Sequence, residues 1–305
     1  MASDQATDGL DLGLVVAAHG RHLVVETPER QRVLCHLRGK KTEAVVGDRV
    51  RWQSSGDEGV VERVAPRRNL LFRQDEWRSK SFAANLDALL VLVAVEPPFS
   101  ESQLTRALIA AQSAGVPAWI GLNKTDLPTA DAARERLAPY RAMGFEVVEF
   151  ALKADPDGAA AVLAPRLTGK TTLVLGPSGM GKSTLINRFV PQAGAQVGEI
   201  SLALNAGKHT TTTTTWYWLG DDPQAGALID SPGFQEFGLR HIEAPDLASL
   251  MPDLRAHLGG CRFYNCTHLH EPGCGVRDAV ERGSVSPSRY RIYGELFAEL
   301  SKSRY

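Results

Sequence analysis

One loop motif constrains the fold of this chain more than any other feature. Residues 176–183 read GPSGMGKS, which fits the pattern G-x4-G-K-[ST], and they follow an apolar run at 171–175 that predicts a β-strand. Glycines allow such a loop to fold into a nest of backbone N–H groups, and the positive end of the helix that follows adds to it. The sequence therefore predicts a strand–loop–helix unit that holds a chain of phosphates.

Within this loop, individual side chains have distinct expected roles. Lys182 would reach the β- and γ-phosphates of a nucleotide, and the Ser183 hydroxyl would ligate Mg²⁺. The candidate nucleotide-binding residues of the loop are Gly176, Pro177, Ser178, Gly179, Met180, Gly181, Lys182, Ser183 and Thr184.

A second motif, NKTD at residues 123–126, follows the predicted strand 117–122. The carboxylate of Asp126 can accept hydrogen bonds from N1–H and N2–H₂ of guanine, whereas adenine would leave it facing an acceptor. Asn123 would contact the opposite edge of the base, the Lys124 stem would cover its face, and Thr125 completes the motif. Alone, the motif also fits a turn that begins a helix, but beside a phosphate loop it indicates guanine-nucleotide binding.

The order of the two motifs is the reverse of that in an ordinary small GTPase, where the phosphate loop comes first. Here the base-reading loop is followed by a candidate closing loop at 150–158, the phosphate loop, a threonine-rich segment at 206–218, and DSPG at 230–233. This is the usual cyclic order of GTPase motifs, begun at a different motif. Because permutation leaves a sheet intact, the order predicts a circularly permuted α/β GTPase domain. Its six strands are predicted at 88–95, 117–122, 146–150, 171–175, 214–220 and 227–230.

The threonine-rich segment lies where switch I is expected. Thr210 or Thr211 would ligate Mg²⁺ and sense the γ-phosphate, while the later threonines would begin a strand. Asp230 would hold Mg²⁺ through water, and the Gly233 N–H would sense the γ-phosphate. The expected Mg²⁺ ligands are thus Ser183, Thr211 and Asp230.

Many GTPases place a water-orienting glutamine after this glycine, but here the residue is Phe234. His209 in the switch I segment is the nearest candidate to replace it, although an ordinary surface histidine fits the residues equally well. The candidate catalytic residues are His209, Lys182, Thr210, Thr211 and Gly233.

A cluster of cysteine and histidine near the C-terminus predicts a metal site. Cys261, Cys266, His268 and Cys274 supply three thiolates and an imidazole, the ligand set of a closed, structural Zn²⁺ site. His270 is an alternative fourth ligand. The segment has few apolar residues, so the metal would supply much of its folding energy.

The flanking regions complete a multidomain architecture. Five short, alternating strands between residues 10 and 72 predict a small barrel, of which the OB-fold is the commonest, with an SH3-like barrel or a meander as alternatives. A helix that begins after Ser286 follows the metal cluster. We expect a flexible tail at 1–9, an OB-fold at 10–73, the permuted GTPase domain at 80–243, and a zinc-binding module with a C-terminal helix at 244–305.

Charge and hydropathy narrow the class of protein. The 305-residue chain has a formal net charge of −1, so nucleic-acid binding must depend on local patches. No apolar run is long enough for a bilayer and the N-terminus does not resemble a signal peptide, so we expect a cytoplasmic protein without a membrane partner. Two basic stretches are compatible with RNA contact or with a solvated linker: Arg38, Lys40 and Lys41, and then Arg67, Arg68, Arg73, Arg78 and Lys80 with Phe72 and Trp77 between them.

Taken together, the motifs resemble the ribosome small-subunit-dependent GTPase A family over nearly the whole chain. The matching segments are AANLDALLVLVA, NKTD, GPSGMGKSTLIN, GKHTTT, DSPGFQEFGL, C-x4-C-x-H-x5-C and SRYRIYGEL. The resemblance implies GTP hydrolysis stimulated by the 30S subunit during its late maturation and triggering release, contact of the barrel and the zinc module with 16S rRNA, and replacement of the missing glutamine by His209.

Two alternatives and one departure from the family pattern stand beside this resemblance. The alternatives are a permuted GTPase that acts on the large subunit and a nucleotide-gated RNA-binding protein with negligible turnover. The departure is the closing loop, which usually reads Ser-Ala-Lys and here reads Ala151-Leu152-Lys153. We expect a monomer that exchanges GTP and GDP.

Overall fold

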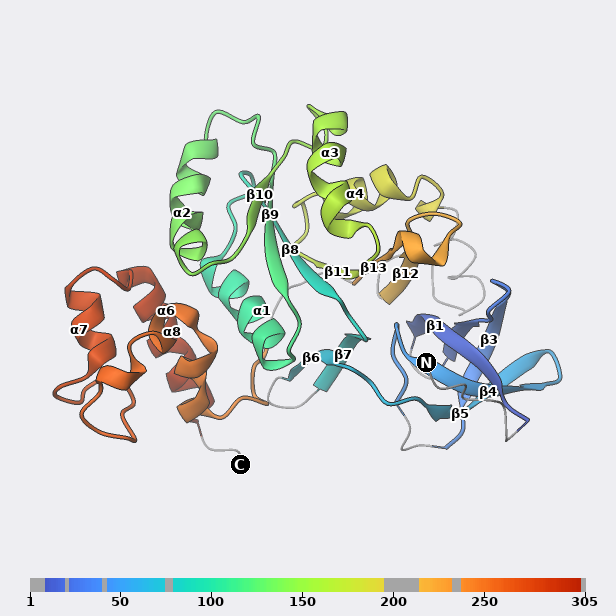
Figure 1. The fold of residues 1–305 in the computed structure, drawn as a ribbon, viewed down its shortest axis with the longest axis horizontal. Helices are drawn as coiled ribbons and strands as arrows, with labels where there is room; N and C mark the ends of the chain where they lie inside the picture. Colours follow the sequence, from blue (N-terminus) through green and yellow to red (C-terminus); the bar gives the residue numbers. More distant parts are fainter. Residues whose placement is uncertain are drawn as a thin grey trace.

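The computed structural model describes residues 9–19, 22–39, 43–74, 79–194, 214–231 and 237–302. It has three parts: an N-terminal five-stranded barrel, a central sheet covered by helices, and a C-terminal helical module. Figure 1 shows the barrel and the C-terminal helices at opposite ends, with the central sheet between them.

The N-terminal strands close into a barrel, as the alternating pattern predicts. Their order is β1-β2-β3-β5-β4, and β4 also pairs with β1, so no edge of this sheet is left open. The parallel pairing of β3 with β5 excludes a simple meander and gives an OB-like barrel. The strands are β1 (Asp11–His19), β2 (His22–Glu26), β3 (Arg32–Leu37), β4 (Arg49–Ser55) and β5 (Glu58–Val64).

The central sheet has the order β10-β9-β8-β11-β13-β12, in which the first five strands are parallel and β12 is antiparallel. All six predicted strands are confirmed. They are β8 (Ala88–Ala94), β9 (Ala118–Asn123), β10 (Val147–Glu149), β11 (Thr171–Leu175), β12 (Thr214–Trp218) and β13 (Ala227–Asp230).

Both faces of this sheet are buried, which explains why β8 is apolar throughout. Its residues alternate between two clusters, because successive side chains of a strand point to opposite faces. Leu89 and Val91 join the cluster that contains α1 and α2 residues, whereas Leu90 and Leu92 join the cluster of α3 and α4. The covering helices are α1 (Glu101–Ser113), α2 (Ala130–Ala142), α3 (Pro156–Leu167) and α4 (Lys182–Phe189).

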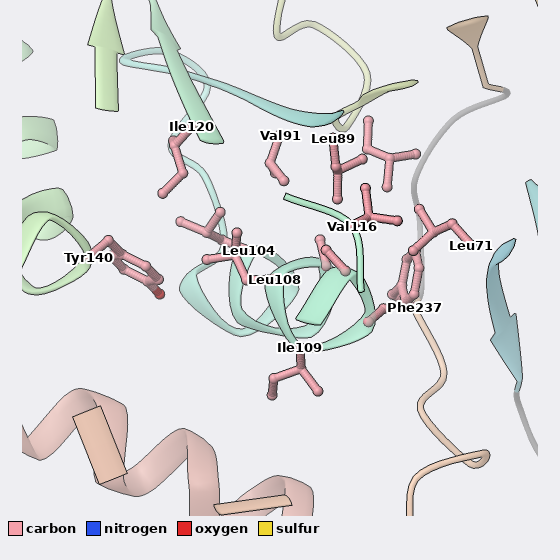
Figure 2. Packing of buried hydrophobic residues seen from close by; sticks show 14 of the residues in the cluster. Leu71, Leu89, Val91, Leu104, Leu108, Ile109, Val116, Ile120, Tyr140 and Phe237 are labelled. Carbon is pink, nitrogen blue, oxygen red and sulfur yellow. The ribbon is translucent and has the colours of Figure 1, made fainter. Parts of the chain in front are cut away.

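Helix α1 packs on the face of the sheet that has the larger buried cluster. Figure 2 shows Leu104 and Leu108 pointing toward the strand residues Leu89 and Val91, with Phe237 at one end of the cluster. Ser100 begins the helix, since its hydroxyl accepts from the backbone N–H of Gln103.

Two connections that the sequence did not predict join the parts. Strand β1 of the barrel pairs with β12 at Ala17 and Ala18, so barrel and central sheet share hydrogen bonds. A separate hairpin, β6 (Leu70–Gln74) and β7 (Ser79–Ala84), occupies the expected linker. The segment after β13 adds to this hairpin, because Gln74 N–H donates to Gly238 O at 2.9 Å and Arg240 N–H donates to Gln74 O at 2.9 Å.

The C-terminal module consists of short helices and one longer one. Ser286 caps α8 through the N–H of Arg289, and Pro287 occupies its first position, as predicted. The elements are η2 (Ala244–Leu250), α6 (Pro252–Arg255), η3 (Leu258–Gly260), α7 (Gly275–Glu281) and α8 (Pro287–Leu300). Among the described residues, no helix combines the length and apolar character needed to cross a membrane.

Candidate nucleotide and metal sites

The two predicted nucleotide motifs meet in one pocket of about 720 Å³. It lies at the carboxyl ends of the parallel strands, the edge at which sheets of this class bind ligands. The pocket is lined by Glu96, Asn123, Lys124, Asp126, Leu127, Lys153, Pro177, Ser178, Gly179, Gly181, Lys182, Ser183, Thr184, Asp230 and Ser231.

The phosphate loop depends on two glycines for different reasons. A Cβ at Gly176 would lie 2.4 Å from the backbone oxygen of Leu92, so only glycine fits as the chain leaves β11. Gly181 has a φ of 107° and begins α4. The Nζ of Lys182 donates to Gly176 O at 2.5 Å, which holds this cation at the loop's own backbone.

Asn123 joins the three loops around the pocket. Its Nδ2 donates to the backbone oxygen of Met180 at 2.9 Å, and its Oδ1 accepts from the N–H of Lys124 at 2.8 Å and of Leu152 at 3.1 Å. The side chain is 3% exposed, so these bonds are shielded from water. Asn123 therefore fixes the base-reading, closing and phosphate loops relative to one another.

The rest of the base-reading loop is arranged around this clamp. Lys124 has a φ of 63°, and its Nζ donates to the backbone oxygen of Glu96 at 2.5 Å. The N–H of Thr125 donates to Phe150 O at 3.3 Å, outside the pocket. Asp126 lines the pocket beside Lys124 and Leu127.

Asp230 at the end of β13 is the most perturbed carboxyl of the site. Burial raises its pKa to about 6, an effect that the nearby Lys182 partly opposes. Burial likewise lowers the pKa of Lys182, and Asp230 opposes that shift. Asp230 Oδ1 is buried and has no hydrogen-bond partner among the described residues. A buried acceptor of this kind is suited to a hydrated Mg²⁺.

Some of the predicted site residues lie outside the described part of the chain, and some of the others do not line the pocket. His209, Thr210, Thr211, Gly233 and Phe234 lie outside the described residues, as do Lys40, Lys41, Trp77 and Arg78. Of the other predicted residues, Thr125, Gly176, Met180, Ala151 and Leu152 support the loops rather than line the pocket.

Three pocket residues were not predicted from the sequence: Glu96, Leu127 and Ser231. Each directly follows a predicted strand or motif at the carboxyl edge of the sheet. That position was the signal that could have identified them.

The predicted metal ligands also come together. Cys261, Cys266, His268 and Cys274 place their ligand atoms within 4.8 Å of one another. The Nδ1 of His268 lies 3.4 Å from the Sγ of Cys261 and 3.5 Å from that of Cys274, and these two sulfurs are 4.0 Å apart. Ligands about 2.1–2.3 Å from a tetrahedral Zn²⁺ have comparable separations, so the set fits this ion. His270 is exposed and outside the group.

Hydrogen bonds from neighbouring residues hold the metal-binding loop. The hydroxyls of Tyr290 and Tyr293 in α8 donate to the backbone oxygens of His268 and Thr267, each at 2.7 Å. Glu271 accepts from the N–H of Thr267 at 2.9 Å. These contacts connect the ligand loop to α8.

Comparison with known proteins agrees with this architecture. A family model described as RsgA GTPase matches residues 64–240. The chain is 62% identical over 298 residues to the small ribosomal subunit biogenesis GTPase RsgA of Variovorax paradoxus (strain S110), covering 96% of this chain and 93% of the relative. It is 53% identical over 293 residues to the protein of that name from Burkholderia pseudomallei (strain K96243), with coverages of 95% and 92%.

Solved structures give the same result. YjeQ from Thermotoga maritima superposes with a TM-score of 0.72 at 30% identity, covering 96% of this chain and 99% of that one. YloQ, described as a circularly permuted GTPase, superposes with a TM-score of 0.69 at 28% identity over the full length of both chains. With its permuted sheet, its OB-like barrel and these matches, the chain belongs to the RsgA GTPase family.

Proposed function

We propose that this chain hydrolyses GTP to GDP and phosphate, and that it does so while bound to the small ribosomal subunit. The observation that carries the GTPase part is the single pocket in which Asp126, Lys182 and Asp230 meet, although they come from three distant stretches of the chain. The relatives named as small ribosomal subunit biogenesis GTPases support the rest.

In this proposal four pocket residues and three residues of the expected switch segments have defined tasks. Asp126 accepts from guanine N1–H and N2–H₂, Lys182 contacts the β- and γ-phosphates, and Ser183, Thr211 and Asp230 hold the Mg²⁺. The bound ion would neutralise charge that develops on the phosphates. His209 would orient the attacking water in place of the glutamine, and the Gly233 N–H would report the γ-phosphate.

Base recognition is tested by the substitution Asp126→Asn. Asparagine presents a donor as well as an acceptor, so preference should shift from GTP toward xanthosine triphosphate, with GTP turnover reduced on the order of a hundredfold. Asp131→Asn is the matched control, because the Asp131 side chain is 88% exposed and belongs to α2 rather than to the pocket. Strict GTP preference in the Asp126 variant would mean that this residue does not read the base.

We further propose a cytoplasmic monomer with the domain limits given above and one structural Zn²⁺ at Cys261, Cys266, His268 and Cys274. The barrel and the zinc module would contact 16S rRNA during late maturation of the subunit, and hydrolysis would trigger release. Co-sedimentation with purified 30S subunits tests this. Binding should be stronger with a non-hydrolysable GTP analogue than with GDP, and equal binding would argue against release by hydrolysis.

A further inference from the structure

The closing loop of the nucleotide pocket lacks the serine that such loops usually carry, yet it is held firmly in this chain. Ala151 stands at the serine position and has no hydroxyl to donate. The next residue is Leu152, whose side chain is 4% exposed. A large apolar side chain has therefore been buried where the loop reaches the nucleotide site.

The surroundings of Leu152 show what this side chain contacts. It belongs to the same buried cluster as Met180 of the phosphate loop and Leu185 of α4. A Cβ built on Gly181 would lie 3.6 Å from Leu152 Cδ1, so the leucine packs beside the glycine that directly precedes Lys182. The side chain thus bridges from the closing loop to the phosphate loop.

The backbone of Leu152 is committed as well. Its N–H donates to Oδ1 of Asn123, and the Nδ2 of the same asparagine donates to Met180 O. The following residue, Lys153, lines the pocket, and no described residue accepts a hydrogen bond from its N–H. Leu152 therefore directly precedes a pocket residue, and its position constrains the backbone of Lys153.

We propose that Leu152 is a positioning residue for guanine binding, whose apolar contact with the phosphate loop replaces the missing serine hydroxyl. The inference rests on the proposed GTPase function. It adds that base recognition and phosphate binding are coupled through one buried side chain. Truncating the Leu152 side chain should populate open forms of the closing loop. Nucleotide affinity should then fall in proportion to the fraction of molecules in which the loop stays closed.

The test compares the GDP affinity of four variants by titration with a fluorescent GDP analogue. Leu152→Ala should bind about tenfold more weakly if the closed loop falls to about a tenth of the population. Leu152→Met keeps the volume and should bind within about twofold of the wild type. Leu163→Ala is the matched control, since Leu163 is a fully buried leucine of the same cluster on α3, outside the pocket.

The fourth variant distinguishes positioning from a general loss of stability. Adding Ala151→Ser to Leu152→Ala restores a hydroxyl in the loop and should recover most of the lost affinity without restoring the melting temperature. Equal weakening by Leu152→Ala and Leu163→Ala, or no rescue by the serine, would overturn the inference. If Leu152→Ala binds like the wild type, the inference alone is wrong. If the wild type binds no guanine nucleotide, the proposed function is wrong too.

Discussion

At the scale of single residues, the site combines a buried carboxylate with a buried lysine. Asp230 and Lys182 each disfavour their charged form because of burial, and each partly relieves the other. Such groups weaken the isolated fold and are retained where a charged ligand needs them. The nucleotide site therefore carries a stability cost that ligand binding can offset.

The substitution Asp230→Asn tests this cost. The folded-state pKa of about 6 lies above the ordinary aspartate value of 3.8, so the carboxylate destabilises the nucleotide-free protein progressively as the pH rises from about 4 to 6. At pH 7.5 the variant should gain free energy of unfolding, by at most about 3 kcal/mol. The gain should fall below this upper bound because the substitution also removes the charge partner of Lys182. At pH 4, where the carboxyl of the wild type is largely protonated, the gain should nearly vanish. Urea denaturation at both pH values measures it.

The same variant should lose GTP hydrolysis by on the order of a hundredfold or more, because Mg²⁺ loses a partner. A variant that is less stable than the wild type at both pH values would contradict the assigned cost of the carboxylate.

At the scale of elements, a small polar cluster fixes the barrel to the central sheet. Glu26 at the end of β2 is 4% exposed and accepts from Trp218 Nε1 in β12 at 2.7 Å. Arg32 donates to the same carboxylate at 3.2 Å, and the Arg30 guanidinium lies 4.1 Å from the centre of the Trp218 ring. Barrel and sheet are thus joined by side chains as well as by the β1–β12 hydrogen bonds.

Removing the indole donor should weaken this junction. Trp218→Phe removes the hydrogen bond to the buried Glu26 Oε1 and leaves that oxygen with the Arg30 guanidinium at 3.7 Å, which we expect to cost about 1–3 kcal/mol. Trp216→Phe is the control on the same strand, since the buried Trp216 Nε1 has no hydrogen-bond partner among the described residues. The control loses the same side-chain volume but no hydrogen bond, and it loses that volume inside the core, since Trp216 is buried and Trp218 only partly so. Thermal unfolding followed by circular dichroism compares them, and a Trp218→Phe variant as stable as the wild type would mean that the Glu26 bond adds nothing.

The elements also show what sequence patterns could and could not predict. The central strands followed from their apolar runs, and the joint use of the two nucleotide motifs followed from the chemistry of their residues. The β6–β7 hairpin was missed because its charged residues, such as Arg73 and Lys80, look like a linker. Its third partner, the segment around Gly238, lies more than 150 residues away in sequence, and no local pattern encodes such pairing. The three-way role of Asn123 likewise depends on tertiary contacts.

At the scale of the whole molecule, α8 fastens the C-terminal module to the central domain. Arg289 is 2% exposed and donates to Asp253 at 2.8 Å within its own module. It also donates to Thr105 Oγ1 of α1 at 2.5 Å and stacks on Tyr140 of α2 at 5.2 Å. Farther along α8, Glu299 pairs with Arg106. The metal loop, itself bonded to α8, is therefore connected to the nucleotide domain through this helix.

Metal removal tests this connection. We expect one zinc ion per chain by elemental analysis, because the described residues contain one group of four ligands. A strong chelator should release it, expose the module to proteolysis and lower the melting temperature, since the binding energy of the ion contributes to folding. Nucleotide affinity should change little. A chain that holds no zinc, or that is equally protease-resistant without it, would contradict the structural role of the cluster.

The most direct test of the central claim is the rate of GTP hydrolysis with and without purified small ribosomal subunits. The proposal predicts stimulation by small subunits of on the order of tenfold or more, since the chain lacks the usual glutamine and, in this proposal, binding to the subunit helps His209 to take its place. Large subunits at equal concentration serve as the control and should have no such effect. An unchanged rate with small subunits, or equal stimulation by large ones, would contradict the proposed function.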